Sequence, residues 1–111
     1  MIHKFCEFYK KIYLLSSKIP KKDRFGIWLK IENICLNIFD FLINASLELK
    51  INKPPILNSI RIKTETIKRL IRIAYELDII SRKTYIELES NLQESSKMIN
   101  GWIKYLSKKS Q

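Results

Sequence analysis

Apolar side chains recur every three or four residues along most of the chain, which is the spacing of one face of an α-helix. Four segments have this period, at about residues 2–18, 23–50, 56–78 and 81–107. No segment alternates with the period of two that a half-buried strand requires. Short links between helices of similar length make neighbouring helices antiparallel. The pattern therefore predicts an all-α protein, a single up-down-up-down four-helix bundle spanning residues 1–111.

The links contain the residues that begin and end helices. Asp23 is placed to cap the second helix, and the run Asn52-Lys53-Pro54-Pro55 is placed to stop it. Ser81 is placed to cap the fourth helix.

The second helix is apolar around more of its circumference than the ~100° stripe that a surface helix of a monomer needs. Its expected core stripe consists of Ile27, Trp28, Ile31, Ile34, Cys35, Ile38, Phe39, Phe41, Leu42, Ala45 and Leu49. Beyond that stripe lies a second apolar group, Leu29, Leu36, Ile43 and Leu47. Two interpretations are open: the helix is the most central of the four, or the second group is a subunit interface. We predict the interface, and hence a homo-oligomer.

Composition excludes several classes of function. The chain has 111 residues, of which 46% are apolar, with two Gly and three Pro, as expected of one packed domain. One His and two separated Cys leave no set for a metal site or a nucleophilic triad, so no catalytic residue, metal or cofactor is expected. No export signal or membrane-spanning stretch is evident, and a reducing cytoplasm suits Cys6 and Cys35 as packing residues. No small-molecule substrate and no membrane partner is expected.

The charge is strongly positive. The formal net charge is +10, and the first 30 residues carry eight basic and two acidic side chains. Lys4, Lys11 and Lys18 recur every seven residues on one side of the first helix, and Lys22 continues the line. Arg61, Lys68 and Arg72 share one face of the third helix. Each row on its own is typical of a solvated helix face, but their sum on so small a chain favours a polyanion partner.

Backbone contacts of this kind would give salt-dependent and weakly selective binding, because phosphates carry no sequence information. The aromatic side chains, Tyr13 among them, lie at the spacing of a helical core, so we expect them to pack rather than to stack on bases.

Residues 19–26, 70–85 and 98–104 form three strings that, in this order, resemble the accessory variability determinant proteins of diversity-generating retroelements. Ile19-Pro20-Lys21-Lys22-Asp23-Arg24-Phe25-Gly26 is similar to the start of that family's second helix. The passage from Leu70 to Leu77, followed by Ile80 to Tyr85, resembles the family's Leu-x-Arg-x-Ala-x-Glu-Leu and Ile-Ser-x-x-x-Tyr strings. Met98-Ile99-Asn100-Gly101-Trp102-Ile103-Lys104 resembles its closing string, except that Asn100 stands where the family pattern has Gly.

The resemblance implies a positively charged homopentameric barrel that binds a reverse transcriptase with its template RNA and DNA. In that role the protein supports mutagenic retrohoming and has no active site of its own. The motif arginines Arg24 and Arg72 are carried over as nucleic-acid-binding residues. An alternative remains open: a structural oligomer of the type encoded in ribosomal RNA intervening sequences, which has the same bundle and no polymerase partner.

Overall fold

The computed structural model describes residues 2–109, and the side chains of residues 2–107. Four long helices make up most of it: α1 (Ile2–Leu15), α3 (Ile27–Leu47), α4 (Lys53–Glu76) and α5 (Arg82–Lys109). A short helix, α2 (Lys21–Arg24), and two 3₁₀ turns, η1 (Ser16–Lys18) and η2 (Lys50–Asn52), lie in the connections. The described residues include no strand, which agrees with the predicted all-α class.

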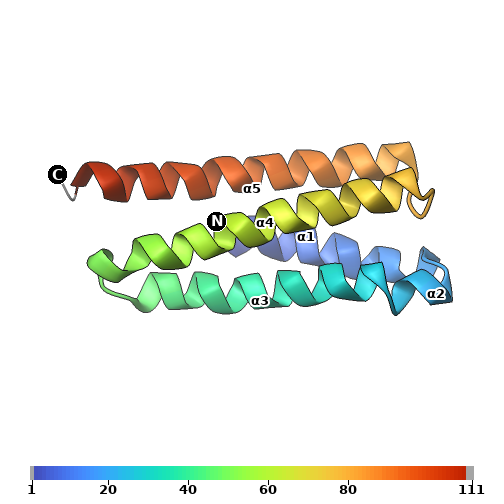
Figure 1. Ribbon diagram of the computed structural model, residues 1–111, viewed down its shortest axis with the longest axis horizontal. Helices are drawn as coiled ribbons and strands as arrows, with labels where there is room; N and C mark the ends of the chain where they lie inside the picture. Colours follow the sequence, from blue (N-terminus) through green and yellow to red (C-terminus); the bar gives the residue numbers. More distant parts are fainter. Residues whose placement is uncertain (1, 110–111) are drawn as a thin grey trace.

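The long helices lie side by side in a rod with extents of 49 × 21 × 19 Å, and successive ones run in opposite directions (Figure 1). Helix α3 packs against α1 and α4, and α5 packs against α4 and α1. Helix α1 has 14 residues and α5 has 28, so α1 accompanies the others along only part of the rod (Figure 1).

One apolar core runs through the bundle. The predicted stripe of the second helix supplies much of it: Trp28, Ile31, Cys35, Ile38, Leu42 and Ala45 are buried. Trp28 is fully buried, and its indole Nε1 donates a hydrogen bond of 3.0 Å to the carbonyl of Ile12, which joins α3 to α1. Burial raises the pKa of the Cys35 thiol to about 12, so Cys35 is a protonated packing residue, as predicted.

The predicted start of the second helix is wrong. The chain forms the short helix α2, interrupts it at Phe25 and Gly26, and begins α3 at Ile27, so Asp23 lies inside α2 and caps nothing. The helix predicted at residues 2–18 ends at Leu15 and tightens into η1. Because α3 ends at Leu47, Leu49 lies on extended backbone with 70% of its surface exposed, outside the core where it was expected.

The two ends of the third predicted helix also differ from the expectation. Pro54 and Pro55 do not lie outside a helix; they occupy the first turn of α4, where a backbone N–H has no intrahelical partner to lose. At its other end α4 closes with Asp78 in the left-handed region, at a φ of 59°. The N–H of Ile79 bonds the Ala74 carbonyl at 2.9 Å and that of Asp78 bonds Tyr75 at 3.0 Å, the two bonds of a Schellman turn.

The predicted cap of the last helix is confirmed. Helix α5 begins at Arg82, and the Ser81 hydroxyl accepts a hydrogen bond of 3.2 Å from the Thr84 N–H.

Gly101 weakens α5 without any visible need within the chain. It lies exposed inside the helix, and a Cβ added there would meet no atom within 4 Å. We therefore expect Gly101→Ala to raise the free energy of unfolding by about 1 kcal/mol, the helix-propensity difference between the two residues. Urea unfolding monitored by circular dichroism measures it.

Gly26→Ala is the matched control, because a Cβ there would lie 3.3 Å from the Lys22 carbonyl oxygen. It should bring no gain in stability. Equal effects of the two substitutions would contradict this account of Gly101.

Candidate nucleic-acid interface

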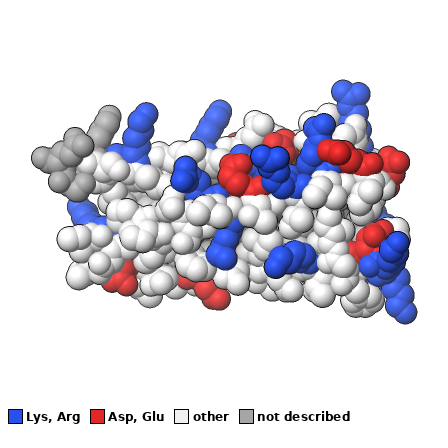
Figure 2. All heavy atoms as spheres, in the orientation of Figure 1, with Lys and Arg blue, Asp and Glu red and all other residues white. Residues whose placement is uncertain are grey.

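A set of cationic side chains lies where α4 and α5 meet. Figure 2 shows Lys and Arg side chains gathered over these two helices, with acidic groups among them, whereas the surface over α3 is largely uncharged. The predicted residues Arg61, Lys68 and Arg72 are here, and Arg69 joins them. They come together because their spacing keeps all four on the solvent side and the α5 side of one helix.

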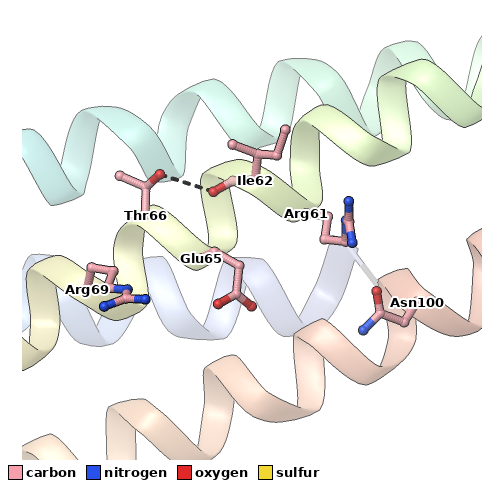
Figure 3. Close-up of a pocket in the computed structure, with 6 residues that line it drawn as sticks. All are labelled: Arg61, Ile62, Glu65, Thr66, Arg69 and Asn100. Carbon is pink, nitrogen blue, oxygen red and sulfur yellow. Dashed lines mark hydrogen bonds between the residues drawn. The ribbon is translucent and has the colours of Figure 1, made fainter.

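A groove of about 480 Å³ is hollowed between the two helices at this place. It is lined by Arg61, Ile62, Glu65, Thr66, Arg69 and Asn100 (Figure 3). Arg61 is held in position because its Nε and Nη2 donate to the Asn58 Oδ1 at 3.2 and 2.6 Å. Arg69 has no partner among the described residues. Sequence reasoning placed Arg69 only on a flank of the basic face, and nothing in its spacing singled it out.

The one acidic group in the groove is compensated locally. Glu65 pairs with the ammonium of Lys68 at 3.2 Å, a contact that leaves 20% of the Lys68 side chain exposed. Lys68 is therefore occupied with neutralising its neighbour, and Arg61 and Arg69 carry the free positive charge of the groove. Their guanidinium groups suit phosphate oxygens, to which they can donate two parallel hydrogen bonds.

Arg72 fastens α4 to α5. Its guanidinium donates to the Tyr85 hydroxyl at 3.3 Å and to Glu76 at 2.8 Å, and it lies 5.7 Å from the centre of the Tyr85 ring. The Tyr85 ring in turn stacks on Tyr75, with 4.6 Å between ring centres. The hydrogen bonds that Arg72 donates to Tyr85 and Glu76 raise the pKa of its guanidinium. These four residues belong to the passage from Leu70 to Tyr85 that resembles the family, and their contacts hold α4 and α5 together beside the turn.

Arg24, the other motif arginine, also makes contacts within the chain. Its Nη2 donates to the carbonyl oxygens of Ile19 at 3.1 Å and Ser17 at 3.4 Å, which fixes the connection between α1 and α2. This connection and the α4–α5 turn lie at the same end of the rod (Figure 1). The structure therefore gives both motif arginines a contact inside the chain in addition to any contact with a ligand.

The predicted basic line on the first helix is not continuous. Lys4 lies against α5 and pairs with Glu94 at 2.8 Å, and Lys11 lines a depression together with Glu87 of α5. Lys18 and Lys22 are exposed beyond the end of α1, where the chain bends through η1. Helix α1 packs mainly against α3 and α5, and Lys4 and Lys11 lie beside Glu94 and Glu87, so they belong to a different face from the α4–α5 groove.

The Lys4–Glu94 ion pair stabilises the folded state to an extent that depends on pH. The hydrogen bond from Lys4 lowers the pKa of the Glu94 carboxyl below its ordinary 4.5. Because the pKa of Glu94 is lower in the folded state than in the unfolded state, this stabilisation is present above pH 4.5. It is lost as the pH falls through the pKa that Glu94 has in the folded state. We expect Lys4→Met to return the pKa of Glu94 toward 4.5, as measured by NMR titration of its side-chain carboxyl.

Lys11→Met is the control for this titration. Lys11 acts on Glu94 through charge alone and is the weakest of the influences on it, so its removal should shift the pKa of Glu94 much less. A larger shift from Lys11→Met than from Lys4→Met would contradict the geometry of the pair.

The second apolar group of the second predicted helix is exposed. Leu29, Leu36, Ile43 and Leu47 have 40%, 46%, 51% and 82% of their surface accessible, so the other described residues leave a large part of each uncovered. The interpretation that this helix is simply the most central one is therefore wrong. A row of exposed apolar side chains along one helix is typical of a contact surface.

Helix α1 adds further apolar surface. Tyr9 packs edge-on against Phe39 of α3, with ring centres 6.1 Å apart. Beside it, Lys10, Tyr13 and Leu14 complete the lining of an apolar depression of about 410 Å³. Tyr13 is 62% exposed, so the expectation that it packs in the core is wrong. Burial raises the pKa of the Glu32 carboxyl on the neighbouring part of α3.

Two classes of site are absent from the part of the chain that the structure describes. It contains no group of three His, Cys, Asp or Glu side chains that could hold a metal ion. His3, the single histidine, is exposed and pairs with Glu7 at 3.1 Å. Within the same residues, no helix has an apolar run long enough to cross a bilayer.

Comparison with known proteins identifies the family. The chain matches the bAvd-like family over residues 1–106, which is nearly its whole length. No curated protein and no solved structure matches it. The match agrees with the resemblance seen in the three strings and with the four long helices of the bundle. This chain is a member of the bAvd-like family.

Proposed function

We propose that the protein is a non-catalytic accessory factor of a diversity-generating retroelement. It assembles with copies of itself, as a pentamer by family resemblance, and binds template RNA and cDNA together with the reverse transcriptase. It thereby supports mutagenic retrohoming in the cytoplasm. The match to the bAvd-like family over residues 1–106 is the observation that carries the proposal.

The surface of the subunit supports this division of tasks. The exposed cations Arg61 and Arg69 lie between α4 and α5, whereas the exposed apolar row lies on α3. One face can therefore contact a polyanion while another contacts a second copy. Lys18 and Lys22 at the end of α1 add exposed charge, and oligomerisation repeats all of it in every subunit.

A comparison of two charge-matched variants tests nucleic-acid binding. Arg61→Gln with Arg69→Gln removes two cations from the groove, and Lys4→Gln with Lys11→Gln removes two from the side that faces Glu94 and Glu87. We expect the first pair to weaken RNA binding and to reduce the salt slope by about two, and the second pair to change both much less. Equal losses would mean that net charge alone attracts the RNA.

The mass of the particle separates the proposal from its alternative. Light scattering after size exclusion, at low and high salt and with or without a structured RNA, reports both assembly and binding. An oligomer that takes up RNA at low salt, and that retains the reverse transcriptase of the same element in a pull-down, supports the accessory role. An oligomer indifferent to both favours the intervening-sequence type of structural protein.

A further inference from the structure

The connection between α3 and α4, residues 48–52, carries apolar side chains that are almost fully exposed. Leu49 and Ile51 have 70% and 83% of their surface accessible, and Leu47 at the end of α3 has 82%. No other large apolar side chain among the described residues is more than 70% exposed. Apolar side chains exposed together in this way are typical of a contact surface.

The connection is held in one conformation although it lies on the surface. The Glu48 carboxylate accepts a hydrogen bond of 3.0 Å from the Asn52 side-chain amide and one of 3.3 Å from the Leu49 N–H. The Asn52 N–H bonds the Leu49 carbonyl at 2.9 Å, and Pro54 and Pro55 fix the backbone in the first turn of α4. The apolar side chains therefore lie on a preorganised turn, which lowers the entropic cost of binding a partner.

A neighbouring copy should not cover this connection in the proposed assembly. The apolar row of α3 runs from Leu29 to Leu47, which is about 27 Å along a helix axis. Copies that meet along this row lie side by side, so in a closed ring the ends of the rods form the two rims. The α3–α4 connection lies at the end of the rod where α5 finishes (Figure 1). Every copy then presents Leu49 and Ile51 on the same rim.

The chemistry of this end of the rod favours a protein over a nucleic acid. The aliphatic side chains of Leu49 and Ile51 can neither bond a phosphate nor stack on a base, so they require apolar side chains in the partner. The nearest free charges are positive: Lys50 is exposed between them, and the Lys53 ammonium lies 5.5 Å from the centre of the Trp102 ring of α5. The one carboxylate of the connection already accepts two hydrogen bonds. Positive charge around an apolar contact favours carboxylates on the partner.

We propose that the α3–α4 connection is the docking site of the reverse transcriptase, and that it binds a segment of that protein in which apolar side chains are bordered by carboxylates. The inference rests on the proposed function, which supplies the partner, and adds to it the surface and the chemistry of the contact. The subunit then has three separate contacts: RNA at the α4–α5 groove, a neighbouring copy along α3, and the polymerase at the rim.

Leu49→Gln combined with Ile51→Gln tests the inference, with the purified reverse transcriptase of the same element as the probe. The polymerase is treated with nuclease so that RNA cannot bridge the two proteins, and its binding to the immobilised oligomer is measured by surface plasmon resonance. We expect the two substitutions to weaken this binding by at least about tenfold, because both remove apolar surface from the contact. The mass of the oligomer, its circular dichroism and its affinity for RNA should not change.

Two further variants make the result specific. Leu14→Gln with Leu77→Gln alters two leucines that are 70% and 64% exposed where α1 and α4 finish, at the opposite end of the rod (Figure 1), and should leave polymerase binding unchanged. Lys50→Glu retains the apolar side chains and should weaken polymerase binding by about threefold or more at low salt, with a smaller effect at high salt. Binding that Lys50→Glu does not weaken would contradict an acidic partner segment.

The other outcomes separate this inference from the proposed function. If Leu49→Gln with Ile51→Gln binds the polymerase as well as the unaltered protein does, the docking surface is wrong while the accessory role stands. If the double variant falls apart into monomers, the connection belongs to the subunit contact and the inference is overturned. Binding of the unaltered protein only in the presence of RNA also overturns it. If the unaltered protein binds no polymerase with or without RNA, both the inference and the accessory role fail.

Discussion

Replacement of Trp28 by Ala should leave the protein unfolded, or only marginally stable, at moderate temperature. Trp28 is the largest of the fully buried side chains, and truncating a buried aromatic residue to Ala costs about 3–5 kcal/mol. The free energy of unfolding of a natural domain is only about 5–15 kcal/mol in total. The substitution also removes the 3.0 Å hydrogen bond to the Ile12 carbonyl that joins α3 to α1. Urea and thermal unfolding monitored by circular dichroism measure the loss.

Two further variants separate the causes of this loss. Trp28→Phe keeps most of the apolar volume and removes the hydrogen bond, so it should cost less than Trp28→Ala. Phe25→Ala removes an aromatic ring three residues away that is 65% exposed, and its effect should stay within about 0.5 kcal/mol. If Trp28→Ala lowers the free energy of unfolding by less than about 1 kcal/mol, the close packing described around the indole is contradicted.

Leu36→Asp combined with Ile43→Asp should convert the protein from an oligomer into a folded 13.3 kDa monomer. Both side chains are about half exposed in the subunit, at 46% and 51%, so the bundle itself tolerates the change. In an assembly each would lose the benefit of apolar burial and place an unpaired carboxylate in the contact, which is costly. Light scattering gives the mass, and circular dichroism shows that the helices are retained.

Ile62→Asp with Ile73→Asp is the matched control for that variant. These two residues of α4 are 55% and 44% exposed, so the chemical change and the exposure are closely similar, but they lie outside the apolar row of α3. The control should keep the mass of the unaltered protein. An unaltered protein that is already a 13.3 kDa monomer, or equal behaviour of the two variants, would remove α3 as the subunit interface.

The positions of the four long helices follow from local information, because apolar spacing is a property of each segment by itself. The break at Phe25 and Gly26 does not follow from it. There the chain leaves one helix and begins another, and Arg24 donates to the carbonyl oxygens of Ser17 and Ile19, a contact that sequence spacing does not reveal. The local signal favoured Asp23 as a cap, but the helix begins earlier, because the Pro20 carbonyl accepts hydrogen bonds from the N–H groups of Asp23 and Arg24.

Only part of the candidate site could be predicted from the sequence. Spacing places Lys4 and Lys11 on one side of a helix but does not say what that side faces. A second signal was present: Glu87 and Glu94 have the same seven-residue spacing, and in two antiparallel helices such rows can meet. The α4 row was recognised from its spacing. The groove that Arg69 and Asn100 share became visible only with the register of α4 against α5.

The short first helix has a thermodynamic consequence. Because α1 contributes 14 residues against 28 in α5, one part of the rod has four helices around its core and the other part has three (Figure 1). Local opening free energies rise with the number of buried apolar contacts. Backbone amides in the three-helix part should therefore exchange with solvent through smaller, less costly openings, while those around Trp28 exchange only through global unfolding. The closing string with Asn100 and Gly101 belongs to the part of α5 that α1 does not reach, so this segment can open locally without disturbing the cooperative unit around Trp28.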